Sequence, residues 1–460
     1  MVRPLLILCL ATLAPAADLE GRLRAALAQV PARGEAAVAV WNCRARAWEA
    51  VAGDPGPLRL ASTTKLLVAA AALAELGPDF RFITRIYAMG PIVGGTVPAL
   101  GVIGGGDPTI DEHFWNGDPV TCLRQWAERI RAAGVTRITG DLVIDNRLFS
   151  GPIRPLTYPS DDNNVTKWFS APASAFAFND NCIDIRAVPT TPGEPCRIET
   201  RPSSPRIVIN NRTRTVGGQG DAKFMVNRAG ESNAITVSGS YGRPTAWFPV
   251  AIYEDPDLLA GDAFAAALRQ AGITVGGTVR LGTVDPRAGP LLVDHRSDLL
   301  PALTLLNQRS QNFYGEQILR LIGLKRLREG SISAGTRAVR EAVAPLIGED
   351  VASVSVLDGS GLSYGNAASA RALCRLLAAI DASSQGKLFA ATLKDKPYAG
   401  ITGKVKTGTL ATVSSLAGYV EGPSGRLAFT ILLGQGGANG WGWGSALRER
   451  LYEVIAEAVR

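Results

Sequence analysis

The sequence predicts an α/β (α+β) fold in which one discontinuous α/β domain is interrupted by a mostly β insert. Strand-like runs lie near both ends of the chain, EAAVAVWN and AWEAVAG early and GITGKVKTG, ATVSSLAGYV and RLAFTILLG late. Between about 299 and 396 apolar residues recur at helical spacing. From roughly 83 to 250 glycine and proline are frequent and short strand–turn units replace helices. We therefore expect residues 17–82 and 251–460 to form one domain and residues 83–250 to form one or two nested inserted modules.

The elements follow one another in a consistent order. Residues 18 to 30 have helical spacing and precede the first two strands. A helix opens at Ser62, where a short polar patch meets a run rich in Ala and Leu. The last two strands are joined by EGPSG, which is typical of a hairpin turn. The final helix places Leu447, Leu451 and Ile455 on one face, which indicates packing against the sheet.

Composition narrows the class of protein. The chain has 460 residues, 46% hydrophobic and 19% charged, enough for two or three domains with substantial cores. The net charge is +7, and no block of Lys and Arg resembles a nucleic-acid-binding arm. We therefore expect no nucleic-acid partner, whereas attraction to an anionic polymer is compatible with the charge.

The N-terminus has the pattern of a secretory signal peptide over residues 1–16. Arg3 supplies the positive region, residues 5 to 13 the apolar core, and residues 14 to 16 (Ala-Pro-Ala) a small-residue cleavage site. No other stretch is long and apolar enough to cross a membrane. We expect a periplasmic or secreted protein.

Cysteine and histidine limit the possible metal sites. Five cysteines follow the signal peptide without any CxxC pair, and the chain has only two histidines, so neither a zinc cluster nor a three-histidine site is expected. Cys182 and Cys196 flank a Pro/Gly-rich turn, so they form either a disulfide across that hairpin or two buried free thiols. No metal and no organic cofactor is predicted.

Ser62 and Lys65 form the first candidate catalytic pair. At positions i and i+3 they share one helix face. The helix N-terminus and burial both disfavour the ammonium, so Lys65 could act as the base that activates the Ser62 hydroxyl. Alone the pair is weak, because Ser-x-x-Lys is far more often a helix cap with a solvated lysine. The same spacing recurs at Ser384 and Lys387, to which we assign no role.

Two further motifs follow Ser62 in order. RSQNFYGE contains Ser310-x-Asn312, and GKVKTGTL contains Lys406, Thr407 and Gly408; each motif occurs once. Taken singly, the first is an ordinary helix cap and the second a charged edge strand. Together with Ser62-x-x-Lys65 they form the three-part set of serine β-lactamases and penicillin-binding proteins.

Each member of the set has a chemical role. Ser310 could pass a proton between Lys65 and a leaving amine, and Asn312 could hold a substrate backbone. Lys406, Thr407 and Thr409 could bind a carboxylate, while Gly408 allows a backbone to approach the strand. The N–H groups of Ser62 and Thr409 would form an oxyanion hole.

The sequence resembles the class C low-molecular-mass penicillin-binding proteins, the D-Ala-D-Ala carboxypeptidases and endopeptidases of the bacterial cell wall. Besides the three motifs, the resemblance rests on GGGDPT, GDLVID, FNDNCIDI and LDGSGLS. The interval of 310 − 62 = 248 residues between the first two motifs matches a family with inserted domains. Two positions depart from the family: Tyr364 stands where Arg is common, and Gln311 where Asp or Asn is frequent.

The resemblance implies a serine transpeptidase/β-lactamase-like domain with an antiparallel sheet flanked by helices. It implies that Ser62 is acylated by peptidoglycan stem peptides ending in D-Ala-D-Ala, and by penicillins as covalent inhibitors, without a cofactor. Asp145, at the end of GDLVID, is a candidate for binding the free amine of a stem peptide; otherwise it is a turn or capping aspartate. The alternatives are a serine β-lactamase and a non-catalytic peptidoglycan-binding protein. The oligomeric state is open.

Overall fold

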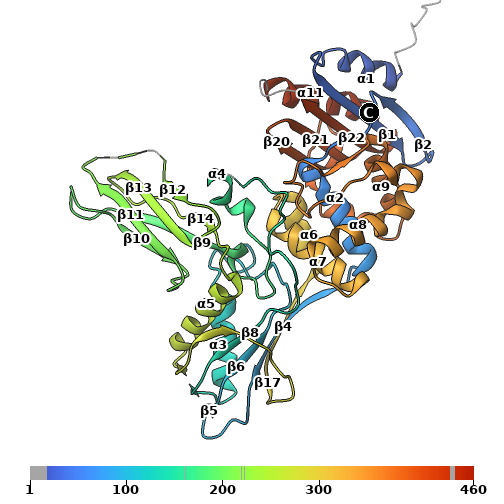
Figure 1. The fold of residues 1–460 in the computed structure, drawn as a ribbon. Coiled ribbons are helices and arrows are strands. Elements are labelled where there is room, and N and C mark those ends of the chain that lie inside the picture. The colour runs from blue at the N-terminus through green and yellow to red at the C-terminus, as the bar shows by residue number, and fades with distance from the viewer. Residues whose placement is uncertain (1–17, 161, 219, 222, 436–440) are drawn as a thin grey trace, which may run out of the picture.

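A six-stranded antiparallel sheet, drawn in the upper part of Figure 1, forms the centre of the first domain of this computed structural model. The structure describes residues 18–160, 162–218, 220–221, 223–435 and 441–460. The strand order is β19-β20-β21-β22-β1-β2, so strands from the two ends of the chain lie side by side. Their bounds are β1 Gly34–Asn42, β2 Ala47–Ala52, β19 Lys394–Asp395, β20 Thr402–Leu410, β21 Val413–Gly422 and β22 Gly425–Gln435.

Helices cover both faces of this sheet. One face is covered by α1 (Leu19–Leu27) and α11 (Trp441–Glu457), whose apolar side chains pack with those of β1, β21 and β22. On the other face a helical layer surrounds the buried helix α2. That layer consists of α2 Thr64–Glu75, α6 Leu299–Gln308, α7 Asn312–Leu327, α8 Ile332–Ile347, α9 Ala370–Asp381 and α10 Gly386–Ala391, with the short turns η1 Ala61–Thr63 and η4 Gly348–Ser353. A two-stranded ladder joins β3 (Leu58–Arg59) and β18 (Ala367–Ala368).

The insert is built on a five-stranded sheet with the order β16-β8-β6-β4-β17. Helices α3 and α5 pack against each other and on this sheet, with Trp126 and Phe264 in the shared core. The bounds are β4 Arg81–Ala88, β6 Leu100–Ile103, α3 Thr121–Ala132, β8 Leu142–Asp145, α5 Pro256–Gln270, β16 Val279–Leu281 and β17 Leu291–Asp298, with the small strands β5 Thr96–Val97, β7 Arg137–Ile138 and β15 Thr274–Val275.

A second module is nested within the insert and projects to the left in Figure 1. It contains two three-stranded sheets, β10-β9-β14 and β11-β13-β12, around a small apolar core. Its elements are α4 Asp162–Val165, η2 Trp168–Ser170, η3 Asn179–Asn181, β9 Cys182–Val188, β10 Arg197–Arg201, β11 Val208–Thr215, β12 Met225–Arg228, β13 Ala234–Tyr241 and β14 Phe248–Ala251.

The predicted end of the insert at residue 250 is wrong. Strand β17 pairs antiparallel with β4, with Asp298 opposite Arg81 and Leu291 opposite Tyr87. The chain therefore leaves the insert beside the point at which it enters. Residues 256–298 therefore belong to the insert, and with α3 and α5 the insert is less purely β than predicted. The nested second module agrees with the sequence-based expectation.

The structure decides between the two alternatives for Cys182 and Cys196, because both cysteines are free and buried and form no disulfide with each other. The hairpin register pairs Val188 with Arg197 and Asp184 with Arg201. Cys196 therefore lies at the closed end of the ladder and Cys182 at the open end, about 20 Å apart at the usual rise per residue. A disulfide requires Cα atoms within about 7 Å of each other.

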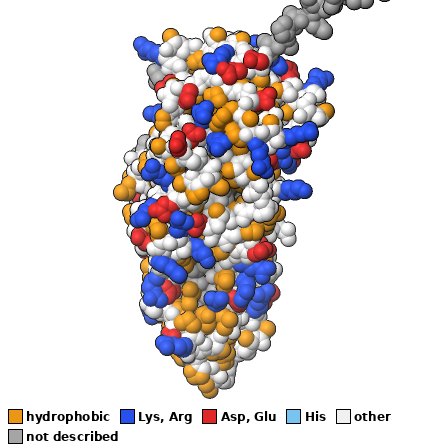
Figure 2. All heavy atoms as spheres, turned by 90° about the vertical axis from the view of Figure 1, so that its right-hand side faces the viewer, with side chains coloured by type: hydrophobic (Ala, Val, Ile, Leu, Met, Phe, Trp, Pro, Cys, Tyr) orange, Lys and Arg blue, Asp and Glu red, His pale blue; other side chains and the backbone are white. Residues whose placement is uncertain are grey.

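None of the described helices combines the length and apolar character needed to cross a bilayer. Basic and acidic side chains are interspersed over the face shown in Figure 2, so positive charge is not gathered into one patch there. The proposed signal peptide, residues 1–16, lies outside the described residues.

Candidate active site

Ser62 lies in the turn η1, directly before the buried helix α2. Residues 64 to 73 of α2 are all buried, and Lys65 among them is fully inaccessible. The side chains of Ser62 and Lys65 meet as their spacing predicts, with 3.0 Å between Oγ and Nζ. By contrast, Ser384 and Lys387, which have the same spacing, are exposed. Burial therefore distinguishes the pair of Ser62 and Lys65 from an ordinary helix start with a solvated lysine.

The surroundings of Lys65 suit a neutral amine. Its Nζ donates to Oδ1 of Asn312 at 2.8 Å and to the carbonyl oxygen of Ser360. A neutral amine has two N–H bonds for these two acceptors and one lone pair left for the Ser62 hydroxyl. Burial lowers the pKa of Lys65 from 10.5 to about 7, although the nearby carboxylates of Asp358 and Glu316 act in the opposite direction. At neutral pH a large fraction of Lys65 can therefore accept a proton.

The second and third motifs meet above this pair. Ser310 has φ +60° in the turn before α7, and its Oγ accepts a hydrogen bond of 2.8 Å from Nζ of Lys406. Lys406 is buried, and that burial together with the charge of Lys65 lowers its pKa well below the usual value. Asn312, the first residue of α7, donates through Nδ2 to the carbonyl of Phe169 at 2.9 Å. All three motifs thus converge on one site.

Strand β20 passes close to Ser62 because it has a glycine at the contact. A Cβ on Gly408 would lie 2.7 Å from the carbonyl oxygen of Leu60 and 3.0 Å from the backbone nitrogen of Ser62. It would lie only 2.2 Å from Oγ of Ser415, which itself donates to Leu60 O at 2.7 Å. The glycine is therefore required for the strand to reach the serine.

Beyond Lys406, no strand from the described part of the chain pairs with one edge of β20. Strand β19 pairs only with Lys404 and Val405, whereas the other edge of β20 pairs with β21 along its whole length. Thr407 and Thr409 are exposed along this segment. An extended peptide could therefore bind along the edge of β20, with these hydroxyl groups within its reach.

Asp358 organises the LDGSGLS segment against the site. Its carboxylate accepts from the N–H groups of Ser360, Gly361 and Ser363 at 3.0, 2.6 and 2.7 Å. This turn presents the Ser360 carbonyl to Lys65. Gly361, with φ +85°, has no room for a side chain, since a Cβ would lie 1.9 Å from the carbonyl oxygen of Ala61.

Glu316 and Tyr158 were not among the site residues predicted from the sequence. Glu316 is fully buried on α7, and burial followed by the charge of Asp358 raises its pKa to about 7. Its Oε1 accepts from the Tyr158 hydroxyl at 2.7 Å and from the Gly359 N–H at 3.0 Å. One signal was available in the sequence, namely a glutamate one helical turn after Asn312 of the second motif.

Asp145 is not part of this cluster. Its carboxylate is paired with the Arg147 guanidinium, 2.7 Å away, and accepts from the N–H groups of Arg147 and Val284. All these partners belong to the insert sheet and its flanking loops. The contacts support the alternative interpretation, a turn aspartate, over binding of a substrate amine.

An arginine lies beside Tyr364, the position at which Arg is common in the family that the sequence resembles. The guanidinium of Arg59 sits over the Tyr364 ring, 5.2 Å from its centre. The Nη1 of Arg59 also donates to Oγ1 of Thr412 at 3.3 Å. Positive charge is thus supplied here from β3.

The chain is similar to known proteins along most of its length. The profile of a family described as D-Ala-D-Ala carboxypeptidase 3 (S13) matches residues 19–441. A D-alanyl-D-alanine carboxypeptidase from Actinomadura sp. (strain R39) is 33% identical over 404 residues, 81% of this chain and 72% of that protein. The D-alanyl-D-alanine carboxypeptidase DacB of Haemophilus influenzae is 27% identical over 392 residues, 80% of this chain and 79% of that protein.

Solved structures share the fold. Penicillin binding protein 4 from Haemophilus influenzae superposes with a TM-score of 0.76 at 23% identity, over 94% of this chain and 99% of that one. A predatory endopeptidase from Bdellovibrio bacteriovorus gives 0.52 at 16% identity over 92% of each chain. These matches confirm the predicted α/β fold with its antiparallel sheet flanked by helices.

Proposed function

This chain belongs to the D-Ala-D-Ala carboxypeptidase 3 (S13) family, and on that premise we propose that it is a serine D-Ala-D-Ala carboxypeptidase acting through an acyl-enzyme on Ser62. The observation that carries the proposal is the buried Lys65, whose Nζ lies 3.0 Å from the Ser62 Oγ. No second basic group is needed to activate the hydroxyl.

Acylation begins with transfer of the Ser62 proton to the lone pair of Lys65. The Oγ attacks the carbonyl carbon between the two terminal D-alanines, and the N–H groups of Ser62 and Thr409 stabilise the oxyanion. The approach of β20 to Ser62 at Gly408 supports this pairing of N–H groups.

Collapse of the tetrahedral intermediate requires a proton on the leaving nitrogen. Lys65 holds that proton, and Ser310, which is bound to Lys406, can deliver it to the amine. The C–N bond breaks, free D-Ala departs and the acyl group remains on Ser62. Water then attacks the ester, gives its proton to Lys65 and releases the shortened peptide with Ser62 restored.

Peptidoglycan stem peptides are the proposed substrates. Lys406, Thr407 and Thr409 line the open edge of β20, where the terminal carboxylate of D-Ala would bind. Asn312 bridges Lys65 and Phe169 and could hold the peptide backbone. A cross-linked stem peptide has the same D-centred bond, so DD-endopeptidase action is part of the proposal.

Penicillins would acylate the same serine. Their strained amide opens on attack by the Ser62 Oγ, and both fragments stay covalently attached, so no leaving group makes room for water. We expect slow release and therefore inhibition. We also propose that residues 1–16 are removed on export and that the mature enzyme works in the periplasm or outside the cell, which N-terminal sequencing of the exported protein would test.

The deciding experiment is intact-protein mass spectrometry after incubation with benzylpenicillin, combined with an assay of D-Ala release from a tripeptide ending in D-Ala-D-Ala. Wild type should gain one penicilloyl group and release D-Ala, whereas Ser62→Ala should do neither. Ser384→Ala is the matched control, because Ser384 has the same spacing to a lysine but is exposed, and it should behave as wild type.

The other outcomes identify the alternatives. Rapid hydrolysis of the drug without adduct, together with no D-Ala release, would indicate a serine β-lactamase. Absence of both adduct and turnover in wild type would indicate a non-catalytic peptidoglycan-binding protein.

A further inference from the structure

A cavity of about 340 Å³ lies where the insert meets the start of α7. Its lining is unusually acidic, with Asp111, Glu112, Asp180 and Asp184. It also includes Gln311, the residue between Ser310 and Asn312. We call it the acidic cavity. None of the catalytic steps above uses these four carboxylates.

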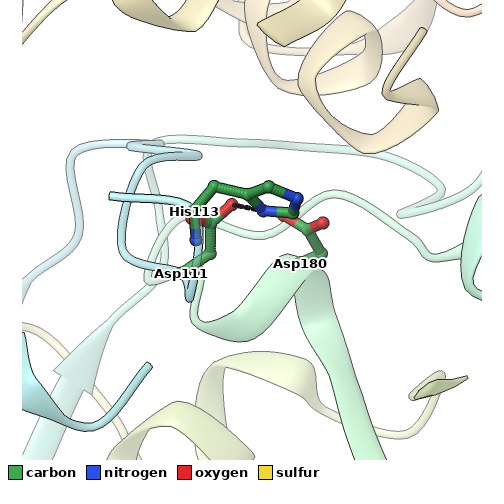
Figure 3. A group of neighbouring side chains, drawn as sticks. All are labelled: Asp111, His113 and Asp180. Atoms are coloured by element: carbon green, nitrogen blue, oxygen red, sulfur yellow. Dashed lines mark hydrogen bonds and ion pairs between the residues drawn. The ribbon is translucent and has the colours of Figure 1, made fainter. Parts of the chain in front are cut away.

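Three side chains converge in this cavity, as Figure 3 shows. Donor atoms of Asp111, His113 and Asp180 all lie within 4.8 Å of one another. Asp111 and His113 come from the segment after β6, and Asp180 from η3, so two separate parts of the insert bring them together.

The position of Asp111 is fixed by several hydrogen bonds. Its Oδ1 accepts from the N–H of His113 at 2.8 Å, and its Oδ2 accepts from the Tyr314 hydroxyl at 2.5 Å. The ring Nδ1 of His113 lies 3.3 Å from the same Oδ2. Asp111 is almost completely buried, so its carboxylate cannot turn to solvent.

Two oxygen atoms in the cavity have no hydrogen-bond donor. Gln311 is 6% exposed, and its Oε1 has no partner among the described residues. The Oδ1 of Asp180 is likewise buried and unpartnered, while its Oδ2 accepts from Nε2 of Gln311 at 3.2 Å. A buried hydrogen-bond acceptor without a donor raises the free energy of the folded state, so each of these two oxygen atoms needs a partner.

Nearby arginines do not fill this role. Arg201 lies 2.9 Å from Asp184 and 3.1 Å from Glu112, so its charge is already shared between two carboxylates. Arg309 lines the rim of the cavity and is exposed. Among the described residues that line the cavity, these two arginines are the only Lys or Arg side chains, and neither is paired with Asp111 or Asp180.

We propose that Asp111, His113 and Asp180 bind a divalent transition-metal ion, with Oε1 of Gln311 as a further oxygen ligand. Carboxylates and an amide oxygen suit hard cations, and an imidazole shifts the preference toward zinc or manganese. The ligand atoms around a tetrahedral zinc ion lie roughly 3.3 Å from one another. Side-chain rotations that move the donor atoms by about 1 Å would bring them to that separation. Such a site needs neither cysteine pairs nor three histidines, so the cysteine and histidine pattern could not predict it.

The site would act on the catalytic segment through Gln311. Because Gln311 lies between Ser310 and Asn312, an ion bound to its side chain would hold both catalytic side chains in place. The ion would be structural and would not touch the substrate. This consequence rests on the proposed function, whereas ion binding itself does not.

The test uses the full mature chain after chelator treatment, with Zn²⁺ as the probe. Wild type should bind one zinc per chain by elemental analysis after gel filtration, and its Tm should rise by about 3 °C at saturation. His113→Ala and Asp180→Asn should lose both effects. Asp180→Asn keeps the size of the side chain, so circular dichroism should show a native fold. His295→Ala, which removes the only other histidine, is the matched control and should keep both effects.

Two results would overturn the proposal. If wild type neither binds zinc nor gains stability, the acidic cavity holds no such ion. If zinc binding survives in both His113→Ala and Asp180→Asn, the ion sits elsewhere, for example on cysteine thiols. When binding is confirmed, benzylpenicillin acylation of wild type should become about 2- to 5-fold faster with zinc, and that of His113→Ala should not change. Binding without this acceleration would keep the metal site and refute its link to catalysis.

Discussion

The Tyr158 hydroxyl donates a 2.7 Å hydrogen bond to Oε1 of Glu316, and both side chains are buried near Lys65. Tyr158 also bonds Oγ of Ser360, whose carbonyl is an acceptor for Lys65. This contact links a segment of the insert to the centre of the catalytic domain. The charge on Glu316 should therefore influence the protonation of Lys65.

Glu316→Gln should shift the pH dependence of acylation to lower pH. The Glu316 carboxylate raises the pKa of Lys65, so its removal leaves more neutral amine. Because the pKa of Glu316 is itself about 7, its negative charge is present mainly at and above neutral pH, so we expect the midpoint of acylation to move down by only about 0.3 pH units, with the largest rate difference near pH 7. Stopped-flow measurement of the benzylpenicillin acylation rate tests this. Tyr158→Phe removes the hydrogen bond but not the charge, and an equal shift there would contradict the electrostatic explanation.

The acylation rate constant of the wild type should itself decrease as the pH is lowered, with a midpoint near pH 7. Lys65 has a pKa lowered to about 7 by burial, and only its neutral form accepts the Ser62 proton. Below the midpoint the rate should drop about tenfold per pH unit, and above it the rate should level off. The measurement is the acylation rate constant from pH 5 to 9. A rate that stays constant down to pH 5 would exclude Lys65 as the base.

Lys406→Ala should abolish the preference for a free terminal carboxylate. We expect wild type to cleave a D-Ala-D-Ala peptide much faster than its C-terminal amide, because only the carboxylate pairs with Lys406. In the variant, the cleavage rate of the peptide with a free carboxylate should fall about 100-fold and that of the C-terminal amide should change little, so the two rates become similar. Lys404→Ala is the control, since Lys404 lies on the same strand but pairs with Asp395 at 2.6 Å. An unchanged acid-to-amide ratio in Lys406→Ala would count against the assignment.

Gly408→Ala should slow acylation without unfolding the protein. The added methyl would meet Ser415, Leu60 and the Ser62 nitrogen, so β20 must move away from the serine. We expect a loss of about 100-fold in acylation, comparable with the loss of an oxyanion-hole donor. Gly217→Ala, where a Cβ meets nothing within 4 Å, should have no effect. Full activity of Gly408→Ala would show that the close approach is not needed.

The free thiols give a further prediction. Because Cys182 and Cys196 are at opposite ends of a ladder, reducing agent should leave Tm unchanged. Unfolded mature protein should titrate five thiols with a chromogenic disulfide reagent. A count of three thiols would indicate one disulfide and would contradict this prediction.

The local part of the site was predictable from the sequence, and the long-range part was not. Ser62 and Lys65 meet because three residues along one helical turn fix their relation. Glu316, Asp358 and Tyr158 come from three distant segments, and only the fold brings them near Lys65. Spacing alone carries no information about such contacts.

The wrong end of the insert and the open alternatives for Asp145 each have a physical reason. The end of the insert was missed because α5 is as rich in Ala and Leu as the helices of the first domain, and β17 carries mostly polar, half-exposed residues. For Asp145, the ion pair with Arg147, two residues further along the chain, supports the turn aspartate, which was one of the two alternatives from the sequence. A short-range ion pair satisfies such an aspartate without any ligand.

The pairing of β1 with β22 also bears on how this protein folds. Glu35 faces Gly434 in that ladder, a separation of 434 − 35 = 399 residues. The central sheet therefore cannot close until almost the whole chain has left the ribosome, and contacts of such long range form slowly. The insert, which is closed by the β4–β17 pair, can fold earlier on its own contacts. Before the last strands are synthesised and paired, Ser62 and Lys65 at the start of α2 would lack a complete oxyanion hole. An unfinished chain would therefore have no hydrolytic activity.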